Sequence, residues 1–398
     1  MAITRAFSFT RGALGKLARL GMEQPDYALR KLRKELHRWL FLRRLARKSC
    51  PSSPSPFTVS FNLTSRCNLR CKMCGQHGET GIYTGPDRTR ACHTLDFDLI
   101  RAVIDEIAAY PHRPDVCLWG GEPLLHPQFA EILSLIRERK LFCVIETNGT
   151  LLERYAGEIV RSNVNSVNVS ILGPRDIHDA ICRVPGAFDR LSRGVRKIVE
   201  ERRRAGRSRS LLKVVCAITP DNYTHLTEVV RLTQDFGADV LIFPLGWFTT
   251  EALGKATDRL YRRIFGCDCA SWQGFAREEH GFDLDHLQDE IRSLYAMDTG
   301  DLYVKFSPSL PLDQIAEYYE KPSRLIGSRY CLFPWMLVDI RPSGDVVPCP
   351  DHPDYVAGNI KQQSLLAIWN GPKMRKFRAE LSRRGTFPIC SRCCGMFT

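Results

Sequence analysis

The sequence lacks any long apolar run, and it lacks an export signal. No stretch of about 18 or more consecutive apolar residues occurs in the 398 residues, which excludes a membrane-spanning helix on length. The N-terminal stretch has no continuous apolar core ending in small residues, so we expect no secretion. Sixteen cysteines in a chain without an export signal favour metal ligation over a disulfide framework. We therefore expect a cytoplasmic, metal-binding protein.

Excess positive charge is scarce outside the first fifty residues. The formal net charge is +13, and residues 1–50 supply +10 of it, from thirteen Lys and Arg against three acidic residues. No nucleic-acid-binding motif or aromatic platform accompanies this charge, so we expect no nucleic-acid partner. An apolar fraction of 44% and a charged fraction of 25% exclude global disorder.

Residues 1–50 have the pattern of a basic amphipathic helical arm. Large apolar side chains recur there at roughly helical spacing, at Leu29, Leu32, Leu36, Trp39, Leu40 and Leu45. We expect the helix to pack on the outside of the body with its basic face in water. The alternative is contact with an anionic membrane or an acidic partner, which would make the protein membrane-associated. The segment 51–56, PSSPSP, predicts a linker.

Strand-like and helix-like segments alternate from residue 57 onward. Strand patterns occur at 57–63, 116–119, 141–146, 166–171, 211–218 and 239–245, with helical patterns between them. Six such units predict an α/β fold, a partial (β/α)6 barrel of the TIM type over residues 57–245. We expect residues 246–330 to form an insert and residues 331–398 a small cysteine-rich extension. Ligands in such folds collect beyond the carboxyl ends of the strands.

Three cysteines follow the first predicted strand within eight residues. Cys67, Cys71 and Cys74 form the row C-x-x-x-C-x-x-C. Closely spaced thiolates select an iron–sulfur cluster or zinc, and both ordinarily take four ligands. A row of three leaves one position open for a small molecule unless a remote residue fills it. A structural zinc loop is the alternative.

The second strand ends in a turn built for close backbone approach. This turn is Gly120, Gly121, Glu122 and Pro123. Two glycines let backbone approach a ligand closely, and the carboxylate can accept a hydrogen bond from an ammonium group. Further along, Arg183 offers a forked donor that suits a carboxylate.

Together these motifs resemble the radical S-adenosylmethionine (SAM) superfamily. The resemblance implies a [4Fe–4S] cluster on the three-cysteine row, with SAM chelated at its open iron and its amino group held by the GGEP turn. It further implies SAM contacts from Asn148, Ser170, Arg183 and Thr219. Leu172 stands where many relatives have an Asp two residues after the serine, which leaves that substrate-side role without a counterpart.

The resemblance also implies a reaction. SAM is cleaved reductively to a 5′-deoxyadenosyl radical, which abstracts hydrogen from an unactivated carbon, while the protein supplies placement and exclusion of water. The electron comes from a small flavodoxin- or ferredoxin-like reductant protein.

The C-terminal cysteines resemble the SPASM/twitch extension of radical SAM enzymes. Cys331 and Cys349 enclose a glycine as C-x12-G-x4-C, and Cys390 and Cys393 form C-x-x-C. The resemblance implies one auxiliary [4Fe–4S] cluster closed by these four thiolates, in the shorter, twitch-like form because the chain stops soon after Cys393. That makes two [4Fe–4S] clusters in all. A zinc ribbon stays open as the alternative.

Cys267 and Cys269 are candidate catalytic thiols because they lie in the insert, where we expect substrate. A thiol there can return a hydrogen atom or add a ligand, although packed, inactive cysteines are the favoured interpretation. We expect oxidation or dehydrogenation of a small polar or sugar-like substrate, with the auxiliary cluster as electron acceptor. The alternatives are a peptide maturase that forms thioether or carbon–carbon crosslinks, an epimerase, and a two-cluster electron carrier without SAM chemistry.

Overall fold

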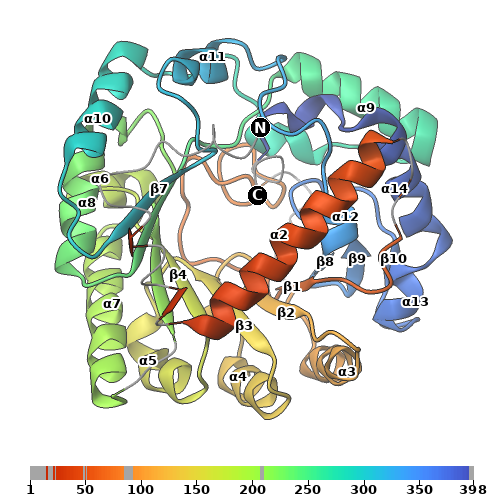
Figure 1. Cartoon of the computed structure of the whole chain (residues 1–398), viewed down its shortest axis with the longest axis horizontal. Helices are drawn as coiled ribbons and strands as arrows, with labels where there is room; N and C mark the ends of the chain where they lie inside the picture. The colour runs from red at the N-terminus through yellow and green to blue at the C-terminus, as the bar shows by residue number, and fades with distance from the viewer. Residues whose placement is uncertain are drawn as a thin grey trace.

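A computed structural model describes residues 15–16, 21–22, 24–47, 50, 52–84, 93–206 and 210–393. Its frame is a ten-stranded sheet in the order β10-β9-β8-β1-β2-β3-β4-β5-β6-β7 (Figure 1). The strands from β8 to β7 are parallel, and β9 and β10 add antiparallel pairs at one edge. The bounds are β1 Thr58–Asn62, β2 Asp115–Trp119, β3 Phe142–Thr147, β4 Ser166–Ser170, β5 Leu211–Val215, β6 Val240–Pro244, β7 Tyr303–Ser307, β8 Leu337–Ile340, β9 Asp345–Val347 and β10 Gly358–Asn359.

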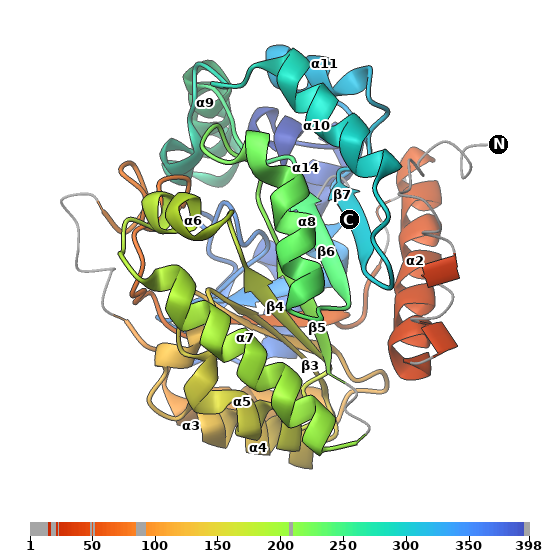
Figure 2. The same cartoon turned by 90° about the vertical axis from the view of Figure 1, so that its left-hand side faces the viewer.

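Helices cover the outer face of the curved sheet, as Figure 2 shows from the side. Those of the barrel are α3 Phe97–Ala108, α4 Phe129–Glu138, α5 Leu152–Arg161, α6 Arg175–Cys182, α7 Ala187–Arg204 and α8 Leu226–Asp235. Those further on are α9 Glu251–Phe265, α10 Leu284–Ala296, α11 Gln314–Glu320, α12 Phe333–Met336, α13 Leu365–Trp369 and α14 Pro372–Arg384. Short 3-10 turns are η2 Pro123–Leu125, η3 Tyr223–His225, η4 Ser271–Phe275 and η5 Pro388–Arg392. The predicted α/β class is confirmed.

The sheet extends beyond the six predicted strands. β7 comes from the predicted insert and pairs with β6, while β8 comes from the predicted extension and pairs with β1. The predicted boundaries at residues 245 and 330 therefore do not interrupt the sheet. Side chains alternate along each strand, so Val59 and Phe61 of β1 belong to the main core under the helices. On the other face Asn168 Nδ2 donates to Glu146 Oε1 (2.6 Å).

The helix α2, Pro25–Ala46, lies across the N-terminal ends of the strands (Figure 1). Arg30 and Lys34 form ion pairs with Asp115 at the start of β2 (2.8 and 2.5 Å). Of the six apolar positions in the predicted amphipathic pattern, Leu45 is buried and the other five are exposed. The expected packing of the apolar face on the body is thus wrong. The rest of the predicted arm lies largely outside the described residues.

The predicted linker is packed over its described residues 52–56. Ser53 Oγ donates to the Trp335 carbonyl (2.8 Å), and Trp369 Nε1 donates to the Ser53 carbonyl (2.7 Å). In the part of the chain that the structure describes, no helix is both long and apolar enough to cross a membrane.

Candidate active site

The three-cysteine row lies on the loop after β1. Backbone amides point at two of its sulfurs: Leu69 N at Cys67 Sγ (3.4 Å), and Gln76 N and His77 N at Cys74 Sγ (3.4 and 3.3 Å). Amide donors of this kind stabilise thiolates and tune iron–sulfur clusters. Burial raises the pKa of Cys67 to about 12, so a cation must replace the proton before this sulfur becomes a thiolate near neutral pH.

The spacing of the sulfurs bears on which metal fits. A tetrahedral zinc ion bonded to sulfur at about 2.3 Å brings its ligand atoms to about 3.8 Å from one another. Among the described residues, the one group of three potential ligands within 4.8 Å of one another is Cys269, His352 and Asp354. In neither predicted cysteine set do three sulfur atoms all lie within 4.8 Å of one another. Both sets offer soft sulfur donors only, which is the donor chemistry that iron–sulfur clusters take.

The helix α6 holds the cysteine loop from one side. Arg70 N and Lys72 N donate to the carbonyls of Cys182 (3.1 Å) and Ile181 (3.0 Å) at the end of α6. The Cys71 thiol lies 3.7 Å from Cys182 Sγ, and this contact together with burial raises the pKa of Cys71. The motif spacing did not identify Cys182. A cysteine directly before a candidate SAM-binding arginine was the available signal.

His178 contacts Cys182 on the side away from the cysteine loop. Its Nδ1 accepts from Leu172 N (3.1 Å), so the neutral ring carries its proton on Nε2, which lies 3.4 Å from Cys182 Sγ. Burial lowers the pKa of His178 to about 4, which keeps the ring neutral at physiological pH. Once Cys71 ligates iron as a thiolate, the Cys182 thiol is the neighbouring group with a proton to donate.

Arg183, predicted to bind SAM, faces a different group. Its backbone is left-handed (φ 55°) as the C-cap of α6, and its guanidinium pairs with the Glu79 carboxylate. This pair holds the pKa of Glu79 below its usual range. The adjacent Cys182, only 1% exposed, is the residue that the helix end turns toward the cysteine loop.

The GGEP turn packs against the cysteine loop. A Cβ at Gly121 would lie 2.2 Å from the Arg66 carbonyl oxygen, and one at Gly120 would lie 2.6 Å from that of Thr64. Gly121 N and Glu122 N donate to these two carbonyls (both 2.8 Å). The glycines therefore allow close contact between two protein segments, which differs from the expected approach to a ligand. Pro123 begins η2 directly after the turn.

Glu122 joins the GGEP turn to the end of β3. Its carboxylate is fully buried and accepts from Thr147 Oγ1 (2.7 Å), Asn148 N (2.7 Å) and Leu124 N (3.1 Å). Burial raises its pKa to about 7. Three protein donors already occupy most of the acceptor positions that we assigned to an ammonium group.

Asn148 connects the end of β3 to the cysteine loop. Its Nδ2 donates to Asn68 Oδ1 (2.8 Å), Asn68 Nδ2 donates to Thr150 Oγ1 (2.8 Å), and Thr150 Oγ1 donates to Asn148 Oδ1 (2.6 Å). This ring of hydrogen bonds stands directly beside Cys67, whose sulfur lies 3.9 Å from Asn148 Nδ2. Asn68 and Thr150 were not predicted as site residues, because single polar residues in loops carry no spacing signal.

Buried polar atoms without partners gather beyond the carboxyl ends of the strands. Within the described residues eight such atoms occur, and six belong to the cysteine loop, to the segments after β5 and β6 or to the loop after β9: Gln76 Oε1, His77 Nε2, Thr219 Oγ1, Trp247 Nε1, Thr249 Oγ1 and His352 Nε2. Buried polar groups normally have partners, so this set suits a polar ligand or ordered water. Thr219, which we predict to contact SAM, belongs to this set. Ser170 ends β4 at the same edge of the sheet.

The four C-terminal cysteines lie near one another around the loop after β9. Burial raises the pKa of Cys349, and the neighbouring Asp351, Cys331 and Cys390 raise it further. The Cys393 thiol contacts Asp351 Oδ2 (3.3 Å). Burial also raises the pKa of Cys390. Four sulfur donors gathered at one loop fit a metal centre, whose cations would replace the thiol protons.

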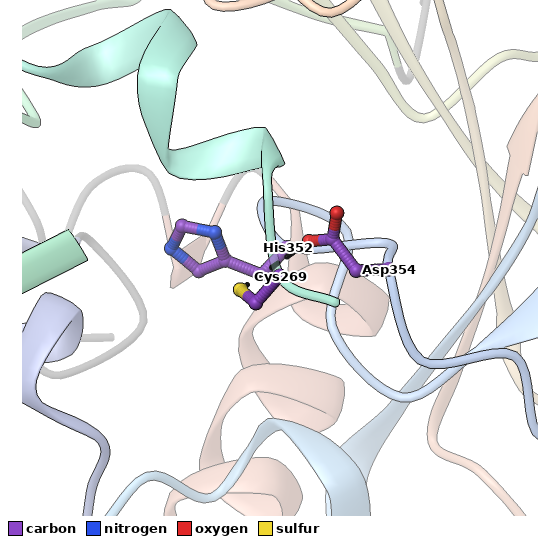
Figure 3. A group of neighbouring side chains, drawn as sticks. All are labelled: Cys269, His352 and Asp354. Atoms are coloured by element: carbon purple, nitrogen blue, oxygen red, sulfur yellow. Dashed lines mark hydrogen bonds between the residues drawn. The ribbon is translucent and has the colours of Figure 1, made fainter. Parts of the chain in front are cut away.

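Cys269 belongs to a different group, which Figure 3 shows with His352 and Asp354. Its thiol is fully buried and donates to Asp354 Oδ2 (3.5 Å). Asp354 also accepts from Ser271 Oγ, which lies 3.0 Å from His352 Nδ1 and so stands between the two ligand candidates. Cys267, the other predicted thiol, is half-buried.

The turn η4 bridges the two cysteine regions. At its start, Asp354 Oδ1 accepts from Ala270 N (3.0 Å) and Ser271 N (3.1 Å). At its end, a Cβ on Gly274 would lie 2.5 Å from the carbonyl oxygen of Gly75, the residue after Cys74. The two backbones are therefore in direct contact.

A cavity of about 830 Å³ lies between the cysteine loop and the extension. One wall is residues 79–84, which follow Cys74, and the other includes the segments around β8, β9 and η4. Its ionic lining is acidic, with five carboxylates against two guanidinium groups: Glu79, Glu251, Glu278, Asp345 and Asp354 against Arg277 and Arg341.

Comparison with known proteins agrees with this geometry. A model of the radical SAM superfamily matches residues 61–231, and a SPASM model, an iron–sulfur cluster-binding domain, matches residues 331–394. The chain is 26% identical over 351 residues to a tungsten-containing aldehyde ferredoxin oxidoreductase cofactor-modifying protein from Pyrococcus furiosus, covering 83% of this chain and 85% of that one. It is 26% identical over 350 residues to an AdoMet-dependent heme synthase from Methanosarcina barkeri, covering 84% and 88%.

A solved structure shares the fold. Streptococcus suis SuiB bound to SAM aligns with a TM-score of 0.57 at 15% identity, covering 81% of this chain and 68% of that one. The chain thus belongs to the radical SAM superfamily and carries a C-terminal SPASM extension. Its cofactors are SAM, the [4Fe–4S] cluster of the radical SAM domain and auxiliary iron–sulfur in the extension.

Proposed function

We propose that this radical SAM enzyme oxidises a small polar substrate that bears an amine, with the auxiliary cluster as electron acceptor. The acidic lining of the cavity between the two cysteine regions carries the proposal. Of the five lining carboxylates, Glu79 pairs with Arg183 and Glu251 with Lys255. The other three, Glu278, Asp345 and Asp354, have no ion pair to a basic side chain among the described residues, and they favour a cationic substrate such as an aminosugar. The Arg341 guanidinium already has protein partners, because it pairs with Asp339 (3.3 Å) and donates to Tyr83 Oη (2.7 Å), so it does little to offset the acidic groups of the cavity.

When bound, SAM and a cysteine-held cluster would supply the radical chemistry that removes a hydrogen atom from a substrate carbon. The protein places the reactants and limits water. Cys67, Cys71 and Cys74 are proposed to hold the SAM-site cluster, with Thr219, Asn148 and Ser170 around SAM. Cys331, Cys349, Cys390 and Cys393 are proposed to hold the auxiliary cluster. The cavity between these sets is the proposed substrate site.

Heme-type and peptide substrates are the competing candidates. The Methanosarcina barkeri relative is named for heme synthesis, but a substrate rich in carboxylates would face an acidic wall in this cavity. A peptide whose basic side chain enters the cavity stays compatible with its charge. Epimerisation is less well supported, because the buried Cys269 thiol is directed at Asp354 and not at a substrate.

The first experiment uses anaerobically reconstituted protein with dithionite and SAM. We expect about eight irons per chain and 5′-deoxyadenosine formation that Cys71→Ala abolishes. Aminosugars, carboxylated tetrapyrroles and basic peptides are then compared for stimulation of 5′-deoxyadenosine release. A flavodoxin or ferredoxin is expected to replace dithionite. Stimulation by the tetrapyrroles alone would contradict the proposed substrate class, and absence of 5′-deoxyadenosine would contradict the reaction.

A further inference from the structure

The outer face of α2 carries a continuous apolar stripe. Exposed large apolar side chains are few in the described part of the chain, and most of them lie on α2: Leu29, Leu32, Leu36, Trp39 and Leu40, with exposed fractions of 39–68%. The three others, Met22, Leu325 and Leu366, lie outside α2. The stripe positions recur at intervals of three and four residues, so their side chains share one face of the helix. An apolar stripe of this size marks an interaction surface.

The inner face of α2 fixes this orientation. Phe41 and Leu45 are buried in the cluster that includes Trp335 and Phe387. Near the other end, Lys213 Nζ donates to Tyr27 Oη (3.0 Å), and the ion pairs of Arg30 and Lys34 with Asp115 lie between. Rotating the helix to bury the stripe would break these ion pairs and uncover Phe41. The stripe is therefore held outward by specific contacts.

Basic side chains border the stripe. Lys31, Arg33, Arg43, Arg44 and Arg47 are exposed on α2 or at its C-cap, against exposed Asp26 and Glu35. The guanidinium of Arg43 lies 4.5 Å from the centre of the Trp39 ring. Apolar anchors with a tryptophan and flanking cations match the boundary between acyl chains and anionic headgroups. A protein partner with an apolar groove would not need this excess of cations.

We propose that α2 docks the enzyme on the surface of an anionic membrane, with the stripe inserted at the level of the headgroups and the helix axis in the membrane plane. The helix α2 contacts the N-terminal ends of the strands, and the cysteine loop follows the carboxyl end of β1, so the two lie on opposite sides of the barrel (Figure 2). A docked enzyme would keep its substrate cavity facing water. This proposal is independent of the proposed reaction.

Sedimentation with vesicles tests the proposal on the full-length, reconstituted enzyme. The probes are phosphatidylglycerol-containing vesicles and pure phosphatidylcholine vesicles. We expect binding to the anionic vesicles and at least about a tenfold loss in partitioning for Leu32→Gln/Leu36→Gln, because two leucine side chains leave the apolar phase. The matched control is Leu325→Gln/Leu366→Gln, which removes two exposed leucines outside the stripe and should bind like the unaltered protein. Salt at about 1 M should weaken binding by screening the cations.

The depth of Trp39 in the membrane gives a second measurement. Quenching of tryptophan fluorescence by brominated anionic lipid, reduced in Trp39→Phe, would support insertion of the stripe. Equal binding to both vesicle types would overturn the role of the basic border. Unchanged binding of the stripe variant, or no binding at all, would overturn the membrane proposal. Concentration-dependent dimerisation without vesicles, lost in the stripe variant, would show that a second copy covers the stripe and would also overturn it.

Discussion

Cys182 Sγ lies 3.7 Å from Cys71 Sγ, which places a fourth thiol beside the proposed ligands of the SAM-site cluster. The His178 ring, neutral and protonated on Nε2, contacts Cys182 from the other side. A thiol held in this way can donate its proton to the Cys71 sulfur when that sulfur is bound to iron. Hydrogen bonds to cluster sulfurs are one of the means by which proteins set reduction potentials.

Cys182→Ala should therefore make the potential of the SAM-site cluster more negative without changing the iron content. Removing a proton donor from a ligand sulfur destabilises the reduced, more negative cluster. A redox titration followed by electron paramagnetic resonance measures the shift. Cys143→Ala, which removes a buried thiol from β3, is the matched control and should leave the potential unchanged. A loss of iron in Cys182→Ala would instead identify Cys182 as a ligand.

Gly121→Ala should disturb the cysteine loop. The new Cβ would lie 2.2 Å from the Arg66 carbonyl oxygen, which is backbone and cannot move without shifting the loop. We expect a destabilisation of about 1–3 kcal/mol and loss of roughly half the iron. Thermal unfolding and iron analysis measure both effects. In Gly157→Ala of α5 the nearest atoms belong to the flexible Arg161 side chain, so stability should change by less than about 1 kcal/mol. Equal iron content in both variants would count against this packing role.

The stability of the cofactor-free protein should depend on pH through Glu122. Its pKa is about 7 in the folded protein against an ordinary 4.5, so the folded state binds the proton more tightly. The contribution of Glu122 is thus complete below about pH 4.5 and is lost as the pH rises through 7, at a cost of about 3 kcal/mol. Urea unfolding from pH 5 to 8 should show a smaller fall in stability for Glu122→Gln. If the unfolding free energies of the unaltered protein and of Glu122→Gln fell in parallel with pH, Glu122 would not be the group that titrates.

The two cysteine sets should be separable by metal analysis. Cys349→Ala should lose about four irons per chain and still form 5′-deoxyadenosine, since the SAM-site ligands remain. Cys269→Ala should keep about eight irons, because this thiol faces Asp354. Zinc in place of the four irons lost from Cys349→Ala would favour the ribbon alternative, and iron loss in Cys269→Ala would add Cys269 to the ligands.

The fold was largely predictable from the sequence, because alternating apolar strands and helical segments specify a parallel sheet on their own. The cysteine row was equally readable, since its three ligands lie within eight residues of each other. The outward face of α2 was not predictable: it depends on ion pairs between Arg30 or Lys34 and Asp115, more than 80 positions apart. The contact of Cys182 with the cysteine loop was not predictable either, because it depends on where α6 ends, at the left-handed Arg183, and no motif encodes that end.

The turn η4 has a thermodynamic consequence. Because Asp354 fixes its start and the Gly274–Gly75 contact fixes its end, a displacement at either cysteine region is transmitted to the other through a short rigid segment. Binding of metal at one region then pays part of the ordering cost of the other, and such coupling is reciprocal by necessity. The two centres should therefore load cooperatively: a variant that has lost one centre should still hold the other, but should release its iron to a chelator faster than the unaltered protein does.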